Sequence, residues 1–365
     1  MPKLTVPKKE FLKMDLSIGG TGLTDKALLA KHLSVMQQAG LTITESLAIV
    51  EDSARGRMKH ILAAVKKSVE SGNSLSDSLK RFPKVFSGIF VSAVYAGETS
   101  GTLSENLKTL ADQLAKEKEL NAKIKGAMLY PIFILAASLV LGLTMSFLVL
   151  PKIIPLFEGL KTTLPPTTRA LIAFSHFVGN HGTALFFGIV FGVIFLLWLI
   201  KQKFSHPVTH WILLNAPIIK KIVRNTNLAR FSRTLGTLLK SGLNIDEALG
   251  ITRTTVGNYY FQNVIEEAGE RVRKGTTLAE NLAEHEKLFP RMTTRMIRVG
   301  EESGNLEDTL AYLAEFYEAE VDNSTKSLST AIEPILLLGI GLVVGFLALS
   351  IITPIYNITG NIQQH

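Results

Sequence analysis

Charged and apolar residues are separated into long blocks along this chain. No charged side chain occurs in residues 126–151, in residues 170–200, or after Glu333. A helix needs about 20 mainly apolar residues to cross the ~30 Å hydrocarbon core of a bilayer. The pattern therefore predicts three membrane-spanning helices, at residues 127–151, 183–200 and 333–354.

The polar blocks show a helical period. Leu29, Leu33 and Met36 recur every three or four positions, and so do Leu235 and Leu238. This spacing places apolar side chains on one face of a helix. A glycine follows each stripe, at positions 40 and 242, where a helix ending in a left-handed residue is expected. Alternating strand patterns are scarce, so an all-α fold is predicted.

Four motifs occur twice in the same order. Residues 39–47 (AGLTITESL) match 241–249 (SGLNIDEAL), and 72–79 (GNSLSDSL) match 275–282 (GTTLAENL). Phe-Pro at 82–83 recurs at 289–290, and 97–103 (GETSGTL) recurs as 300–306 (GEESGNL). An internal repeat of this length indicates a duplicated structural unit. The unit comprises a polar helical domain and its following span, residues 26–155 and 228–358.

Helix starts are marked at matching places in both repeats. Thr42 and Glu45 form a capping-box pattern, as do Ser74 and Asp77, and their counterparts follow in the second repeat. The predicted fold class is an all-α membrane protein with two repeated cytosolic bundles of about six helices each and three transmembrane helices. Residues 103–125 lack Gly and Pro, which predicts a nearly continuous helix leading into the first span.

The predicted organisation is as follows, in chain order. The chain begins with a short N-terminal extension (1–25), which is followed by the first bundle (26–126), the first span (127–151) and an external loop (152–182). After these come the second span (183–200), a cytosolic connector (201–227), the second bundle (228–332), the third span (333–354) and an external tail (355–365).

Basic residues flanking the spans predict the orientation. Lysines precede the first span and follow the second, whereas the tail after the third span has no Lys or Arg. The positive-inside rule then puts residues 1–126 and 201–332 in the cytosol, with the C-terminus outside. The first residues contain no apolar stretch typical of a signal peptide.

Composition narrows the function classes. The 365 residues include 39 Lys and Arg against 31 Asp and Glu, and no Cys. Disulfide and thiolate metal chemistry are thereby excluded. The modest basic excess suits an anionic membrane surface better than nucleic acid, for which no binding motif is present. No phosphate loop, zinc motif or nucleophile elbow occurs, so neither a catalytic residue, a metal ligand nor a cofactor site is predicted.

Six residues are predicted as contacts with partners or other subunits. Glu98 and Glu301 recur beside a glycine turn, in which one helix is expected to stop at Gly97 and the next to be capped by Thr102. A purely structural turn is the alternative for this motif. Gly188 with Gly192, and Gly341 with Gly345, are pairs spaced to let membrane helices approach closely.

The repeated motifs resemble those of the type II secretion F / PilC family, over residues 26–358. This resemblance implies an inner-membrane platform protein of a type IV pilus or type II secretion machine. Such a protein would couple a cytosolic hexameric assembly or retraction ATPase to the insertion or removal of pilin or pseudopilin subunits. It would be a multi-pass homo-oligomer in the bacterial inner membrane, in contact with other inner-membrane components of the machine, and not an enzyme.

Two other classes of protein stay open from the residues alone. A transporter or channel built from repeats is the main alternative, although no Asp, Glu, Lys or Arg lies in any predicted span. A membrane-anchored enzyme would need a convergent set of catalytic side chains, which the sequence does not show.

Overall fold

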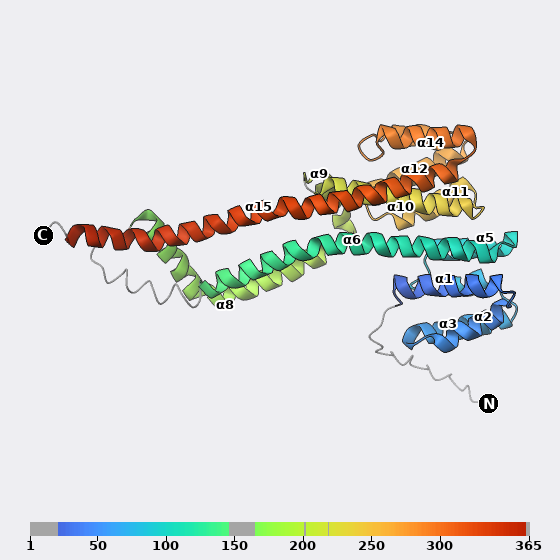
Figure 1. Ribbon diagram of the computed structural model, residues 1–365, viewed down its shortest axis with the longest axis horizontal. Coiled ribbons are helices and arrows are strands. Elements are labelled where there is room, and N and C mark those ends of the chain that lie inside the picture. The colour runs from blue at the N-terminus through green and yellow to red at the C-terminus, as the bar shows by residue number, and fades with distance from the viewer. Residues whose placement is uncertain (1–20, 146–164, 201, 218, 363–365) are drawn as a thin grey trace, which may run out of the picture. The chain divides into compact units, whose positions relative to one another are not determined.

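The structure is a computed structural model that describes residues 21–145, 165–200, 202–217 and 219–362 (Figure 1). All regular secondary structure in these residues is helical. The first half contains α1 (Leu23–Gln38), α2 (Ile43–Ser53), α3 (Gly56–Glu70), α4 (Leu75–Lys80), α5 (Gly88–Ser100), α6 (Leu103–Thr144) and α8 (Pro166–Ile200). After the short η2 (Lys203–Ser205) come α9 (His206–Asn215), α10 (Lys220–Lys240), α11 (Ile245–Thr255), α12 (Tyr259–Arg273), α13 (Leu278–Ala283), α14 (Arg291–Ser303) and α15 (Leu306–Ile362).

The order of helices repeats as the sequence motifs do. Helices α1–α6 and α10–α15 follow one another with similar lengths; α5 and α14, for example, have 13 residues each. We call α1–α6 the first repeat and α10–α15 the second repeat. The predicted all-α fold is confirmed for the described residues.

Contacts divide the chain into two compact units. The first takes in the described parts of Met1–Glu119, Leu228–Gly257 and Phe261–Glu315. The second takes in those of Leu120–Asn227, Asn258–Tyr260 and Phe316–His365. The first unit therefore holds the polar helices of both repeats.

Helix ends in the first unit are fixed by local chemistry. Gly40 and Gly242 have φ of 84° and 89°, a left-handed conformation that only glycine adopts without strain. They follow the ends of α1 and α10, as predicted. The Thr42 hydroxyl accepts a hydrogen bond from the Glu45 backbone N–H, and the Glu45 carboxylate accepts one from the Thr42 N–H, so the predicted capping box is present.

Each repeat has its own apolar core. In the first, Phe86 and Phe90 are fully buried and their ring centroids lie 4.9 Å apart. In the second, Phe289 packs against both Phe231 and Phe261, at 5.2 Å in each case. Burial of these rings and of the other apolar side chains around them drives the packing of these short helices.

Two helices are long and apolar enough to cross a membrane among the described residues. They are the stretches Leu103–Gly142 of α6 and Leu306–Ser350 of α15, which contain residues 127–142 of the predicted first span and 333–350 of the predicted third span. Helix α6 runs without interruption through Pro131, so the predicted continuity of 103–125 with the span is confirmed. For the predicted second span, the described residues give only the shorter apolar stretch Val190–Ile200. That span stays a prediction.

Three predicted boundaries differ from the structure. Helix α5 does not stop at Gly97; it continues to Ser100, and Gly101 is the left-handed residue that ends it. Helix α8 begins at Pro166, inside the predicted loop 152–182, because no further proline interrupts the apolar sequence after it. Helix α15 continues to Ile362, into the predicted tail. Residues 1–20, 146–164 and 363–365, where other parts of the predicted extension, loop and tail fall, lie outside the described residues.

Candidate functional site

The repeated glutamates close the N-termini of two short helices. The Glu98 carboxylate accepts hydrogen bonds from the backbone N–H groups of Leu75, at 2.5 Å, and Ser76, at 3.0 Å. In the second repeat, Glu301 accepts from Leu278 at 2.6 Å and from Ala279 at 2.9 Å. The first N–H groups of a helix lack partners within the helix, and a carboxylate there is also favoured by the helix dipole.

These contacts join α5 to α4 and α14 to α13. Both glutamates reach back over the same distance, 23 residues, to the first residue of the shorter helix. The capping Ser74 and Thr277 lie one residue earlier, so each glutamate follows its capping residue by 24 positions, and this constant spacing was the signal in the sequence for this role. A contact of Glu98 or Glu301 with another protein is not tested by this geometry and stays a prediction.

The glycine beside each glutamate permits a close helix crossing. A Cβ atom on Gly97 would lie 2.8 Å from the Leu103 Cα atom. One on Gly300 would lie 3.1 Å from the Leu306 Cα atom and 2.8 Å from the Thr309 Oγ1 atom. The GExSG motif is thus a structural device that lets α5 and α14 pack closely against the starts of α6 and α15.

Polar side chains line the contact between α6 and α10. Gln113 of α6 bonds both Thr234, at 3.4 Å, and Thr237, at 3.1 Å, and all three are buried. Arg230 forms an ion pair of 2.9 Å with Glu117. Residue numbers rise along α6 as they fall along α10, so the two helices run antiparallel. Paired polar groups of this kind fix one register between two helices.

A cleft of about 420 Å³ opens beside this polar contact. It is lined from α6, α10 and α15 by residues of both charges, including Asp112, Lys116, Arg233, Lys240 and Glu307. Because the signs are mixed, the cleft does not favour an anionic or a cationic ligand.

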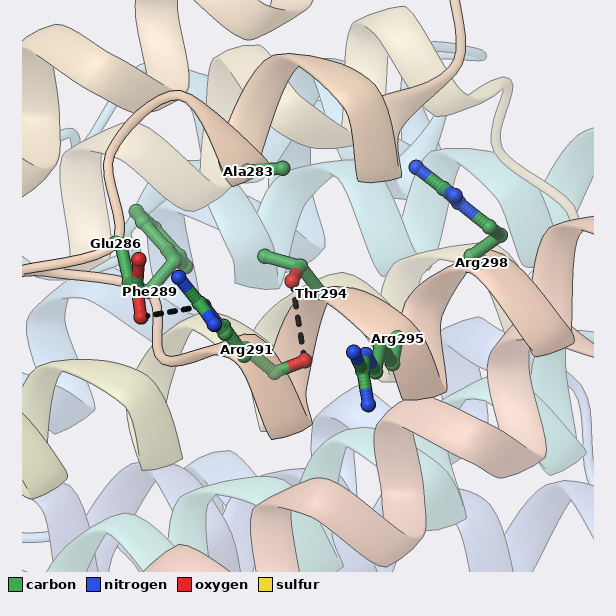
Figure 2. A pocket seen from close by; sticks show the side chains of 7 residues that line it. All are labelled: Ala283, Glu286, Phe289, Arg291, Thr294, Arg295 and Arg298. Carbon is green, nitrogen blue, oxygen red and sulfur yellow. Dashed lines mark hydrogen bonds and ion pairs between the residues drawn. The ribbon is translucent and has the colours of Figure 1, made fainter.

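Helix α14 presents a basic ridge beside a smaller pocket of about 290 Å³ (Figure 2). Arg291, Arg295 and Arg298 come from this helix and lie around the pocket with Glu286. The Arg291 Nε atom pairs with the Glu286 carboxylate at 2.8 Å. Arg295 and Arg298 have no ion-pair partner within the part of the chain that the structure describes. Two free guanidinium groups on an exposed helix suit an acidic protein surface.

A histidine of the second unit closes the start of α12. The Tyr259 N–H donates to the His210 Nδ1 atom at 2.9 Å, so the imidazole is the acceptor. Burial lowers the pKa of His210, and the neighbouring His206, whose ring stacks at 5.0 Å, lowers this pKa further. Both effects keep the ring neutral, the state that can accept this bond.

The predicted glycine pairs lie on open helix surfaces. A Cβ atom on Gly188, Gly192, Gly341 or Gly345 would meet no other atom within 4 Å. The structure leaves room for another helix at these positions, and helix–helix contact there stays a prediction. No cluster of His, Asp and Glu able to hold a metal occurs among the described residues.

Fold and surfaces together define a class of protein. The chain is a helical protein with a duplicated unit and, among the described residues, two helices of membrane length.

Comparison with known proteins gives the family. The family model described as type II secretion system (T2SS), protein F, matches the chain twice, over residues 29–151 and 231–354. The chain belongs to this family.

Several curated relatives cover most of the chain. It is 36% identical to the type IV pilus assembly protein PilC of Thermus thermophilus, over 94% of this chain and 85% of the relative. It is 34% identical to the type II secretion system protein F of Aeromonas hydrophila, over 98% and 92%. It is 31% identical to the type IV pilus assembly protein PilC of Pseudomonas aeruginosa, over 96% and 95%.

Proposed function

We propose that this chain is an inner-membrane platform protein of a type IV pilus or type II secretion machine. It couples a cytosolic hexameric ATPase to the insertion or removal of pilin or pseudopilin subunits. The names of its relatives, which include both pilus assembly and secretion proteins, support this range of machines.

The observation that carries the proposal is the continuity of α6. This single helix of 42 residues begins in the packed first unit, where Leu107 and Leu110 are buried, and reaches Thr144 in an apolar stretch of membrane length. Helix α15 repeats the arrangement over 57 residues. Two unbroken helices supply a mechanical link between a cytosolic partner and subunits held in the membrane.

In this proposal the polar helices of both repeats lie in the cytosol and the C-terminus lies outside, as the flanking basic residues predict. Glu98 and Glu301 are proposed contacts in the cytosol, and the four span glycines are proposed contacts in the membrane. The chain itself performs no chemistry in this account. A transporter is less favoured because its spans would hold ionisable or broken polar segments near the midplane, and the predicted spans hold no charged residue.

The test is reconstitution of the full chain in lipid vesicles with the assembly ATPase of its own machine. We expect the ATPase to co-sediment with vesicles that contain the full chain, and we expect its rate of ATP hydrolysis to change at least severalfold. Vesicles with the chain alone should show no ATP hydrolysis above background. ATP hydrolysis by the chain alone, or an ATPase that neither binds nor responds, would contradict the proposed function.

A further inference from the structure

Within the first unit, the two repeats meet through one pair of faces. The first repeat contributes its last two helices, α5 and α6, and the second contributes its first two, α10 and α11. Arg230 pairs with Glu117, and Thr237 donates to Gln113. The Ile251 side chain lies 3.7 Å from the place of a Cβ atom on Gly88.

The corresponding positions of the first repeat are exposed and apolar. The match of residues 39–47 with 241–249 aligns Arg230, Thr237 and Ile251 with residues 202 positions earlier, which are Leu28, Val35 and Ile49. Their exposed fractions are 47%, 55% and 49%. Large apolar side chains at three interface-equivalent positions indicate a surface that another protein covers.

The second repeat leaves the opposite face open. Helices α14 and α15 are the counterparts of α5 and α6, and they expose Met292, Val299 and Tyr312, each between 41% and 58%. We call α1 with α2 the leading face and α14 with α15 the trailing face. Among the described residues, each chain thus has one pair of faces in contact and one open face of each kind. On the trailing face Glu320, the counterpart of Glu117, pairs with Lys221 of the same chain at 2.9 Å.

Charges on the two open faces are complementary. The exposed side of α1 carries Lys31, whereas α15 carries the exposed Glu315. Helix α2 exposes Asp52, whereas the exposed arginines of α14 include Arg295 (Figure 2). The contact between the two repeats of one chain has the same arrangement of charges, because Arg230 of α10 pairs with Glu117 of α6. Opposite charges on facing helices select the partner and its register.

We propose that a second copy of this chain covers these surfaces, with the trailing face of one copy docked on the leading face of the next. The contact between copies then repeats the contact that each chain makes between its own repeats. Such a contact is heterologous, because the two faces differ. Each copy can therefore bind a further copy in the same way, until the last copy meets the first and the ring closes. This inference rests on the duplicated structure and not on the ATPase role.

Cysteine cross-linking tests the pairing directly, because the chain has no cysteine of its own. Two differently tagged full-length chains are co-expressed in membranes, one with Ile49→Cys and the other with Arg291→Cys. Arg291 is the first residue of α14, as Gly88 is of α5, so these positions reproduce the Ile251–Gly88 contact. We expect a disulfide-linked dimer from the mixture at a level at least tenfold above that from either variant alone.

Matched variants test whether cysteines at these positions can form a disulfide and whether exposed cysteines cross-link through random encounters between chains. A single chain with Gly88→Cys and Ile251→Cys should form an internal disulfide. Tyr95→Cys is similarly exposed, at 53%, and paired with Ile49→Cys it should cross-link at least tenfold less than Arg291→Cys. An internal disulfide in the control without a mixed dimer would overturn the proposal. So would a single variant that cross-links to itself as strongly as the mixture does.

A second measurement separates a copy of the chain from the ATPase as the occupant. Ile49→Asp should lower the mass of the detergent-solubilised oligomer, and Tyr95→Asp should leave it unchanged. Loss of ATPase binding with an intact oligomer would assign the leading face to the ATPase and overturn the proposal. If the ATPase fails to respond to any form of the chain, only the proposed function is contradicted, because the cross-link does not depend on it.

Discussion

Removal of the Glu98 carboxylate is expected to loosen α4. The Glu98→Ala change takes away both acceptors from the N–H groups of Leu75 and Ser76, and both of these residues are buried. A hydrogen bond to a charged group contributes about 1.5–3 kcal/mol, and part of the loss is recovered where water reaches the freed N–H. We therefore expect the opening of α4 to become easier by about 2–4 kcal/mol.

Hydrogen–deuterium exchange of the full chain in detergent measures this opening. At about 1.4 kcal/mol per factor of ten, amides of α4 should exchange roughly 30-fold faster or more in Glu98→Ala. Glu98→Gln keeps one acceptor oxygen and should show a smaller increase. Glu301→Ala should have the same effect on α13, because its two bonds have nearly the same lengths.

The exposed Glu302 provides the matched control, since its removal should change stability by less than about 0.5 kcal/mol. Unchanged α4 exchange in Glu98→Ala would refute the capping role. If α4 exchange were unchanged in Glu98→Ala but ATPase coupling were weaker, the carboxylate would be a partner contact, as the sequence analysis predicted.

Three further predictions concern other parts of the chain. Gly300→Ala should destabilise the protein by about 1–3 kcal/mol in thermal unfolding, because the added methyl group has no room; Gly250→Ala, in open space within α11, should not. The lowered pKa of His210 means that the folded state binds fewer protons, so its bond to Tyr259 is present near pH 7 and is lost as the pH falls through this lowered pKa, below the ordinary value for histidine. Amides in the first turn of α12 should then exchange faster at pH 5.5 than at pH 7, beyond the intrinsic change, and His210→Ala should abolish that difference. Replacing Gly341 and Gly345 by Leu should reduce detergent-stable oligomers severalfold, because bulky side chains separate the helix backbones; an unchanged oligomer would contradict this.

Local signals made much of the fold predictable from the sequence. Gly40 and Gly242 end helices in the left-handed conformation, and Thr42 with Glu45 forms the expected capping box. Each of these features depends on a few neighbouring residues. The end of α5 was mispredicted because Gly97 resembles a helix stop in sequence, whereas its actual role is to admit α6 at close range.

The surfaces were less predictable, because they depend on contacts between distant segments. The residues next to Gln113 and Arg230 in the sequence do not indicate that α6 packs against α10. The sequence alone therefore did not distinguish the helix faces in contact from the open ones. Glu98 was predicted as a partner contact from its recurrence, but recurrence alone does not distinguish an external contact from an internal cap. The structure supplies the internal bonds that the sequence reading left out.

The proposed mechanical link between a cytosolic partner and the membrane is tested most directly by interrupting α6 between its packed part and its apolar part. Four glycines inserted after Lys125 should weaken the helix there by about 4 kcal/mol relative to four alanines, at about 1 kcal/mol each. Four alanines add just over one turn and keep the helix faces within about 40°. The readout is filament assembly or secretion in cells, with membrane insertion and ATPase binding measured in parallel. The account predicts that both chains insert and bind the ATPase, but that only the alanine chain supports assembly. Equal activity of the two chains would contradict it.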